Sequence, residues 1–341
     1  MTEKTHVCHG SWFSCQDWIL ESYFSVLCGL LCRAYSFMFD AAILLGNDAL
    51  ESFYFGGTVV HITMNNGNNK DYETMVGNLI KEVFGISFTP WFKLKLWDNR
   101  YESYAVIKND RMLANVFIYK TEITVYGKPF YALQFGGVAT RKDERSKGLS
   151  RLLMEHIYAK YTDTPAFLGA NPSVTNFYPR FDFRPVQTYQ PYIEVTMHNE
   201  NSNAVKLSPD DITVIEAIHR RKMHSNTLDS LNTQPIQIFN LLLAYSDAIY
   251  YLPNCAAIVV ARQKDDALFI ADVIAETPVL FNTLQKELPF TEVKRVKFGF
   301  CPDWLDINPE WTPVDMVKEP YFIRGEWNLP AKFRFPIISE T

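Results

Sequence analysis

Cysteine is scarce in most of this sequence. Four of its six cysteines lie in the first tenth of the chain, and only Cys255 and Cys301 follow them. Scarcity of this kind is typical of proteins from a reducing compartment, so we expect a cytoplasmic protein. The early cysteines and His9 lack the paired short spacings of zinc ligands, and no metal site is predicted.

An excess of positive charge is also missing. The chain has 33 basic and 38 acidic residues in 341, a net charge of −5 at pH 7. Nucleic-acid binders are usually basic, so we expect no nucleic-acid partner. A mildly acidic balance is compatible with an amine ligand, although it is the commonest case for soluble proteins. The hydrophobic content of 48% is normal for a globular protein that buries a sizeable core.

Long uncharged runs are lacking as well. Charged residues interrupt the apolar segment 18–46, whose longest uncharged stretch, 22–32, is shorter than the ~20 residues that a membrane-spanning helix needs. The first residues do not resemble a secretory signal. We therefore expect no membrane partner. We interpret residues 1–63 as an N-terminal extension of uncertain order that carries no chemistry, and we expect the main fold to begin near Met64.

The stretch that follows alternates between helical and strand periodicity. Apolar residues recur every three or four positions in its helices, and β-branched and aromatic residues mark its strands. The pattern predicts helices, then an antiparallel meander, then a helix, a strand, a short helix and a last strand. The predicted helices are 71–84, stopped by Gly85, 88–97, one from Gly148 and 173–181; the predicted strands are 101–107, 113–125, 130–140, 165–170 and 184–195.

A charged loop joins the third strand to the next helix. Its basic residues are followed at once by Gly148; they are Arg141, Lys142, Arg145 and Lys147. The first amides of a helix lack intrahelical partners and, with the positive end of the helix dipole, form an anion site. From the loop alone two readings stay open. One is a diphosphate site, and the other is a solvated loop whose glycine eases the start of the helix.

Two ordered motifs resemble those of the GNAT superfamily of N-acetyltransferases. Val138-Ala-Thr140 followed by Arg145-Ser-Lys-Gly148-Leu-Ser150 is similar to its acetyl-CoA signature R/Q-x-x-G-x-G/A, with Ser150 in place of the last small residue. Downstream, Asn171 and the run 176–183 resemble the element "N…FY…GF", with Asp182 where glycine is usual. The resemblance covers roughly residues 65–195 and implies an α/β (α+β) fold, with a mixed, mostly antiparallel sheet flanked by helices.

The resemblance implies acetyl-CoA as co-substrate. Its pantetheine arm would pair with the strand edge, and its diphosphate would lie on the amides of the loop and helix start. Asn171 would hold the pantetheine or a nearby water, or would simply begin a turn. Arg141 and Lys142 either reach the adenosine phosphate or are solvated. The cofactor-binding residues so implied are Val138, Ala139, Thr140, Arg145, Ser146, Lys147, Gly148, Leu149, Ser150 and Asn171.

The implied reaction is direct transfer of the acetyl group to an amine of a small-molecule or peptide acceptor. Tyr178 matches the tyrosine that protonates the departing sulfur; the alternative is one more packed aromatic ring. No general base is assigned, since Glu122, Glu144, Glu155 and His156 are candidates by residue type only. The alternative function is a non-catalytic acyl-CoA-binding sensor or scaffold. The acceptor and any homo-oligomeric state stay open.

The second half, 199–341, repeats the plan of the first. The turn after Ala275, ETPVLFNTL, has neither glycine nor basic residues. This half therefore resembles the degenerate second domain of tandem-GNAT bacterial acetyltransferases, and we expect domains at 64–198 and 199–341. Predicted here are a helix capped by Ser208 that ends in the basic cluster 219–222, helices 234–245 and 277–288, strands 256–262, 268–275 and 292–300, and strands in the tail 321–341.

Overall fold

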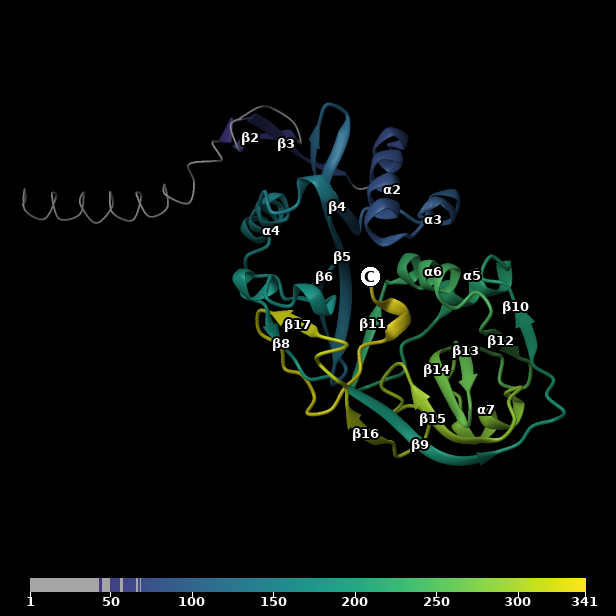
Figure 1. Ribbon diagram of the computed structural model, residues 1–341. Helices are drawn as coiled ribbons and strands as arrows, with labels where there is room; N and C mark the ends of the chain where they lie inside the picture. Colours follow the sequence, from purple (N-terminus) through teal and green to yellow (C-terminus); the bar gives the residue numbers. More distant parts are fainter. Residues whose placement is uncertain (1–42, 45–49, 56–57, 66, 68) are drawn as a thin grey trace, which may run out of the picture. The chain divides into compact units, whose positions relative to one another are not determined.

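The computed structural model describes residues 43–44, 50–55, 58–65, 67 and 69–341, which divide into compact units at 1–61 and 62–341 (Figure 1). In the first unit β1 (Ile43–Leu44) pairs antiparallel with β2 (Leu50–Phe55). β3 (Thr58–Asn65) continues past the boundary between the units. The early cysteines and most of the apolar segment 18–46 lie outside the described residues. Among the helices described, none is long and apolar enough to cross a membrane.

The second unit begins with the predicted helices and meander. Helix α2 (Lys70–Phe84) ends at Gly85, whose φ of 73° is left-handed. Helix α3 (Thr89–Lys93) is shorter than the expected 88–97, because Lys95 turns the chain with a φ of 53°. The three strands are β4 (Tyr101–Lys108), β5 (Arg111–Val125) and β6 (Lys128–Thr140). They pair antiparallel, as predicted.

The segment after β6 follows the predicted order with two corrections. A 3₁₀ turn, η1 (Lys142–Glu144), precedes helix α4 (Leu149–Lys160) and strand β7 (Ala166–Gly169). The predicted helix 173–181 is wrong. Two 3₁₀ turns stand there, η2 (Pro172–Val174) and η3 (Tyr178–Phe181), each with a proline in its first positions that cannot donate to a continuing helix. The predicted strand 184–195 is two strands, β8 (Arg184–Pro185) and β9 (Tyr189–Met197).

The first sheet draws strands from both halves of the chain. Its order in the second unit is β4-β5-β6-β7-β17-β8, and β11 (Leu228–Leu231) also pairs with β5. β17 (Tyr321–Arg324) inserts between β7 and β8. Only β6 and β7 are parallel among these pairs, through Leu133 to Ala166 and Gln134 to Phe167. The sheet is therefore mixed and mostly antiparallel, as predicted.

The second sheet also contains a parallel pair, β14 (Ala267–Ile274) and β15 (Val293–Phe298). Helix α7 (Phe281–Glu287) connects these two strands. Its order is β10-β12-β13-β14-β15-β9-β16, so β9 joins it from the first half. Its strands are β10 (Val205–Leu207), β12 (Ile249–Leu252), β13 (Ala257–Lys264), β14 (Ala267–Ile274), β15 (Val293–Phe298) and β16 (Glu310–Pro313). Its helices are α5 (Ile212–Arg220), α6 (Gln234–Leu243) and α7 (Phe281–Glu287).

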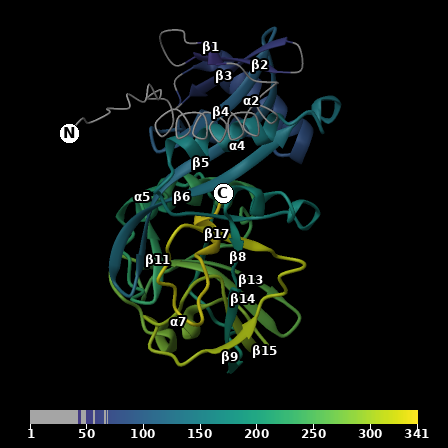
Figure 2. The same ribbon diagram turned by 90° about the vertical axis from the view of Figure 1, so that its left-hand side faces the viewer.

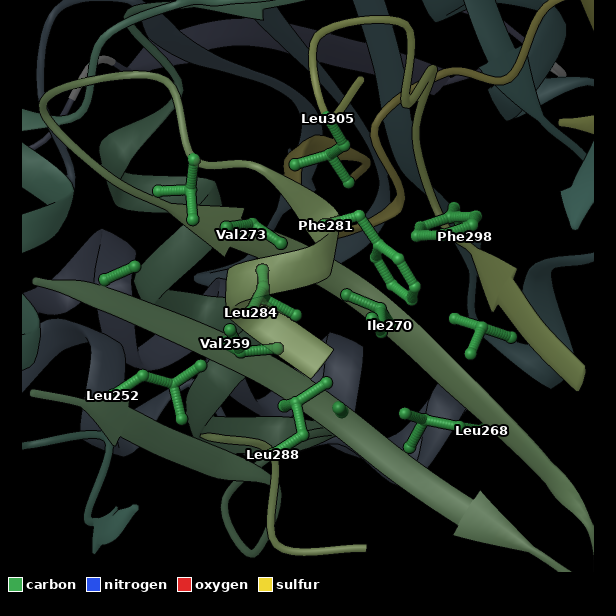
Figure 3. Packing of buried hydrophobic residues seen from close by; sticks show 14 of the residues in the cluster. Leu252, Val259, Leu268, Ile270, Val273, Phe281, Leu284, Leu288, Phe298 and Leu305 are labelled. Atoms are coloured by element: carbon green, nitrogen blue, oxygen red, sulfur yellow. The ribbon is translucent and has the colours of Figure 1, made fainter. Parts of the chain in front are cut away.

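The predicted cap at Ser208 is wrong. Asp211 caps α5 and accepts a hydrogen bond from the Thr213 amide at 2.8 Å, whereas the Ser208 hydroxyl donates to Asp210. Both residue types are good caps, so composition alone does not choose between them. The predicted helix 277–288 shortens to α7, whose apolar side packs under the sheet (Figure 3). Phe281 and Leu284 are buried there with Ile270 and Phe298.

Buried charges and the C-terminal tail tie the two sheets together. Arg221, at the end of α5, forms ion pairs of 3.4 Å with Asp229 on β11 and Asp272 on β14, and all three side chains are at most 9% exposed. In the tail, the Ile337 amide donates to Gly299 at 2.8 Å, and Asn240 of α6 donates to the carbonyl oxygen of Ile338 at 3.0 Å. The tail's last 3₁₀ turn, η4, covers Ile337–Ser339.

Candidate functional site

A cavity of about 1020 Å³ opens over the C-terminal end of β6. Four parts of the second unit line it: β6 from Phe135 to Thr140, the charged loop with the start of α4, the turns η2 and η3, and a wall from α2, α3 and α6. The C-terminus also reaches it, beside β6 in both views (Figures 1 and 2). Most of the predicted cofactor residues line this cavity, but Ala139 and Lys147 do not.

A bulge in β6 shapes the strand edge at the cavity. The register with β5 shifts between Asn115 and Phe117, so one extra residue of β6 is accommodated near Gly137. Gly137 has a φ of 51°, and a Cβ there would collide with the Phe117 ring. Only glycine fits this position, and its carbonyl accepts from the Asn115 side chain at 3.4 Å. The bulge turns the main chain just before Val138 out of regular register with β5.

The loop and the start of α4 carry a run of unsatisfied main-chain donors. In the part of the chain that the structure describes, the amides of residues 145–150 donate to no acceptor. Gly148 is the N-cap of α4, with a φ of 84° and no capping side chain, and Ser146 also has a positive φ of 62°. Successive amides in such a conformation form a concave anion site, and the helix dipole strengthens it.

The basic side chains of the loop differ in the interactions that they form. Arg141 donates to the Met112 carbonyl at 2.7 Å and forms an ion pair with Glu82, so it is held against the protein. Lys147 pairs with Glu144 at 2.9 Å. Lys142 is exposed and forms no ion pair with the other described residues. Of these four basic residues, Arg145 alone is among the described residues that line the cavity, and Lys142 lies outside its lining.

Ser150, which departs from the small residue of the motif, has a structural partner. Its hydroxyl lies 2.6 Å from that of Thr140, so the end of β6 and the first turn of α4 are joined directly. Arg145 supports the same corner, because its Nε donates to the Thr140 carbonyl at 3.3 Å. The strand-to-helix join is thus held by two side-chain contacts at Thr140.

Asn171 and Tyr178 line the cavity from η2 and η3. The Asn171 Oδ1 accepts from the amide and hydroxyl of Ser173 at 3.0 and 2.8 Å, which orients its amide group. The Tyr178 ring is 5% exposed and packs against Phe183 and Phe322. Burial raises the pKa of Tyr178 to about 12. Its hydroxyl is therefore protonated at neutral pH, as that of an unperturbed tyrosine also is.

A comparison of the sequence with known protein families finds an acetyltransferase domain. A family model described as "Acetyltransferase (GNAT) domain" matches residues 39–186, a range that starts upstream of Met64. The matched segment, which is less than half of the chain, is therefore identified as a GNAT domain. No curated protein matches the chain.

Solved structures are similar to the chain at low identity, and the first named here shares its fold. A conserved protein of unknown function from Enterococcus faecalis V583, "Probable N-Acyltransferase", has a TM-score of 0.52 at 12% identity, covering 78% of this chain and 72% of that one. A GCN5-related N-acetyltransferase from Kribbella flavida scores 0.47 at 12% identity, with coverages of 77% and 70%. Eis1 from Mycobacterium abscessus scores 0.48 at 12% identity, with coverages of 77% and 73%.

Asp182, at the end of η3, replaces the glycine that is usual in the motif. Asp182 has a φ of 60°, a conformation in which glycine is unstrained and aspartate is tolerated. Its carboxylate also accepts from the Tyr158 hydroxyl at 2.8 Å. The departure from the motif therefore keeps the backbone turn that places Tyr178.

The four candidate bases of the GNAT domain do not gather at the site. Only Glu144 among them lines the cavity, and it lies in the loop, paired with Lys147. Glu122 accepts from Asn232 at 3.2 Å, and Glu155 pairs with Arg151 at 2.7 Å. The ring of His156 packs 5.7 Å from that of Tyr104. No general base follows from this arrangement.

Sequence reasoning missed two parts of the site. Thr341 lies on β6, where its hydroxyl donates to the Phe135 carbonyl at 3.2 Å, and a Cβ on Gly136 would collide with it. The wall from α2, α3 and α6 was also missed. The Gly136-Gly137 pair was a local signal for the bulge, but nothing local in the sequence marks a tail or a distant helix as lining a cavity.

Proposed function

We propose that this chain is an N-acyltransferase that moves an acetyl group from acetyl-CoA to an amine. GNAT domains carry out acyl transfer, which supports the reaction class. The observation that carries the proposal is the run of unsatisfied amides at 145–150, on the same cavity as Tyr178. Amides and a helix start are suited to the diphosphate of CoA, and the edge of β6 at Val138 and Thr140 is suited to its amide-containing arm.

In the proposed reaction a neutral amine attacks the thioester carbonyl. The new C–N bond forms, the C–S bond breaks and the thiolate of CoA leaves. Tyr178 donates its proton to that sulfur, the nitrogen that attacked loses a proton to water, and Tyr178 regains a proton from solvent, so no net proton is gained or lost. The raised pKa of Tyr178, about 12, keeps the hydroxyl protonated before transfer.

Calorimetry with CoA, followed by a panel of amines screened for CoA release, tests the proposal. We expect binding and release with the native chain and neither with an Arg145→Glu, Gly148→Trp double variant. Well-folded native protein that gives no heat of association with CoA would contradict it. Binding without release for any amine would favour the sensor or scaffold function instead.

Tyr178→Phe separates catalysis from binding. Phenylalanine keeps the ring contacts with Phe183 and Phe322 and removes only the hydroxyl. We expect CoA affinity to stay the same and kcat to fall by about 10²- to 10⁴-fold, the usual contribution of a positioned acid. An unchanged kcat for every acceptor would show that Tyr178 is a packing residue.

A further inference from the structure

One side of the cavity is formed almost entirely by apolar side chains. They come from the second half of α2, the link to α3, α3 itself and α6. We call this surface the apolar wall; its residues are Val83, Phe84, Ile86, Phe88, Trp91 and Phe239. It shares one continuous cavity with Tyr178 and with β6 at Val138. A molecule that reacts beside Tyr178 is therefore in reach of this wall.

The apolar wall is preshaped by rings packed behind it. Phe88 and Trp91 are buried, with their ring centroids 5.7 Å apart in an edge-on arrangement. Phe88 also meets Phe239 edge-on at 5.0 Å. In front of them Phe84 is 46% exposed, and Val83, Ile86 and Phe239 are half-buried. Exposed apolar groups over a rigid aromatic base are typical of a pocket that takes an apolar ligand.

Polar groups are few on this side. The Trp91 indole donates to the Pro235 carbonyl at 3.2 Å, so it offers a ligand only its ring. Tyr101 of β4 also lines the cavity. The charged residues of the cavity lie on the loop, α4 and η3 instead; they are Glu144, Arg145, Arg151 and Arg180. In the described part of the chain, the apolar wall thus has no aspartate or glutamate.

This distribution of charge discriminates between classes of amine. A second ammonium group buried against the apolar wall would lose its hydration and gain no carboxylate. An aliphatic or aromatic body would instead exchange water for apolar contact, which is favourable in proportion to its area. Building on the proposed function, we propose that the acceptor is a primary amine with a single amino group on an apolar body of aromatic size.

A matched series of amines with acetyl-CoA tests this proposal. We expect kcat/KM for 2-phenylethylamine to exceed the values for ethylamine and for spermidine by at least about tenfold, as for apolar groups that fill a preformed pocket. Equal values across the series, or a preference for spermidine, would overturn the inference. If octanoyl-CoA gained over acetyl-CoA with ethylamine while amine size had no effect, the apolar wall would hold the acyl chain, and the proposal would again be wrong.

Phe84→Glu tests the apolar wall directly, because this exposed side chain can change without disturbing the core. We expect kcat/KM for 2-phenylethylamine to fall by about fivefold or more and the ratio of spermidine to 2-phenylethylamine to rise. Leu94→Glu is the matched control: Leu94 is 36% exposed at the end of α3 and does not line the cavity. It should leave both values unchanged. Equal effects of the two substitutions would overturn the inference.

Calorimetry with CoA distinguishes failure of the proposed function from failure of the proposed substrate class. If the native protein does not bind CoA, the proposed function itself fails. If it binds CoA and acetylates spermidine better than 2-phenylethylamine, only the substrate class fails. Protein that binds CoA and acetylates none of these amines contradicts the substrate class, and the enzyme assignment fails as well if no amine of the wider panel releases CoA.

Discussion

The two strand-to-helix joins of the second unit share a topology and differ in what meets the start of the helix. In each, a strand passes through a short loop into a helix and then into a parallel strand: β6–α4–β7 and β14–α7–β15. At the first join the amides of 145–150 lack acceptors among the described residues, and all of these residues except Lys147 line the cavity. At the second, the Phe281 amide donates to the carbonyl of Leu305 at 2.9 Å, and Leu305 is fully buried.

The loop residues account for this difference. The first loop has positive φ values at Ser146 and Gly148, which turn successive amides to one side. The second loop has no glycine, and its N-cap, Leu280, is extended with a φ of −78°. Repeating the topology therefore does not repeat the binding site. Substitutions at the first join should weaken CoA binding, whereas substitutions of buried residues around the second should lower stability and leave binding unchanged.

Asp272→Ala, on β14 just before the second join, is expected to have the largest effect on stability. It leaves Arg221 buried with one carboxylate fewer, and removing a partner from a buried ion pair costs about 3–5 kcal/mol. Urea unfolding should therefore show a loss of about 4 kcal/mol, with the CoA affinity of the folded protein unchanged. The matched control is Asp266→Ala on the same hairpin, whose pair with Lys294 is exposed. A loss similar to that control would contradict the structural role of the pair.

Gly148→Val tests the first join, and Leu280→Val is its counterpart at the second. A β-branched residue in the left-handed region is strained by about 1–2 kcal/mol, and its side chain also stands beside the amides. We expect CoA affinity to fall by at least about 30-fold, or about 2 kcal/mol. Leu280 is exposed, so its substitution should change neither affinity nor stability measurably. Calorimetry that shows equal losses for the two variants would break the comparison between the joins.

Glu340, in the tail that touches both sheets, should make stability depend on pH. Burial raises the pKa of Glu340 to about 7, against the opposing effect of Arg334. The folded state therefore binds this proton more tightly than the unfolded chain does. The stabilisation is fully present below the unfolded pKa of about 4.5 and is lost as pH rises through about 7.

The measurement is the free energy of unfolding from pH 5 to pH 8, for the native chain and for Glu340→Gln. One unit of pKa shift corresponds to about 1.4 kcal/mol, and the part of the side chain that stays exposed reduces the effect. We expect the native chain to lose about 1.5 kcal/mol relative to the glutamine variant over this range. Parallel profiles would show that the carboxyl does not titrate in a buried site.

The sequence predicts those parts of the fold whose signals are local. Helix α2 with its stop at Gly85, and the meander of β4, β5 and β6, depend on periodicity within a few residues. The insertion of β17 between β7 and β8, and the pairing of β11 with β5, join segments far apart along the chain. Such pairings depend on tertiary packing, and short strands with little alternation give no local warning of them.

The residues of the candidate site also divide into those with a local sequence signal and those without one. Gly148, Arg145 and Tyr178 belong to motifs with fixed spacing, so the sequence predicts them as a group, and the structure places them on one cavity. Phe84 and Phe239 are ordinary apolar positions of amphipathic helices. Only the assembled fold, in which α3 packs against α6, makes them a cavity wall. A motif therefore indicates the co-substrate side of such a site, whereas the acceptor side needs the assembled fold.

Lys142→Ala should have the smallest effect on CoA affinity. It tests whether main-chain amides or side-chain charges hold the diphosphate at the first join. Lys142 is exposed, so its attraction to a phosphate is screened within about 10 Å at 0.1 M salt. We expect CoA affinity to fall about threefold, or about 0.6 kcal/mol, at low ionic strength and to match the native chain in high salt. Lys264→Ala, an equally exposed cation at the end of β13, should have no effect under either condition. A loss above about tenfold that persists in high salt would mean that side-chain charge, and not the amides of 145–150, holds the diphosphate.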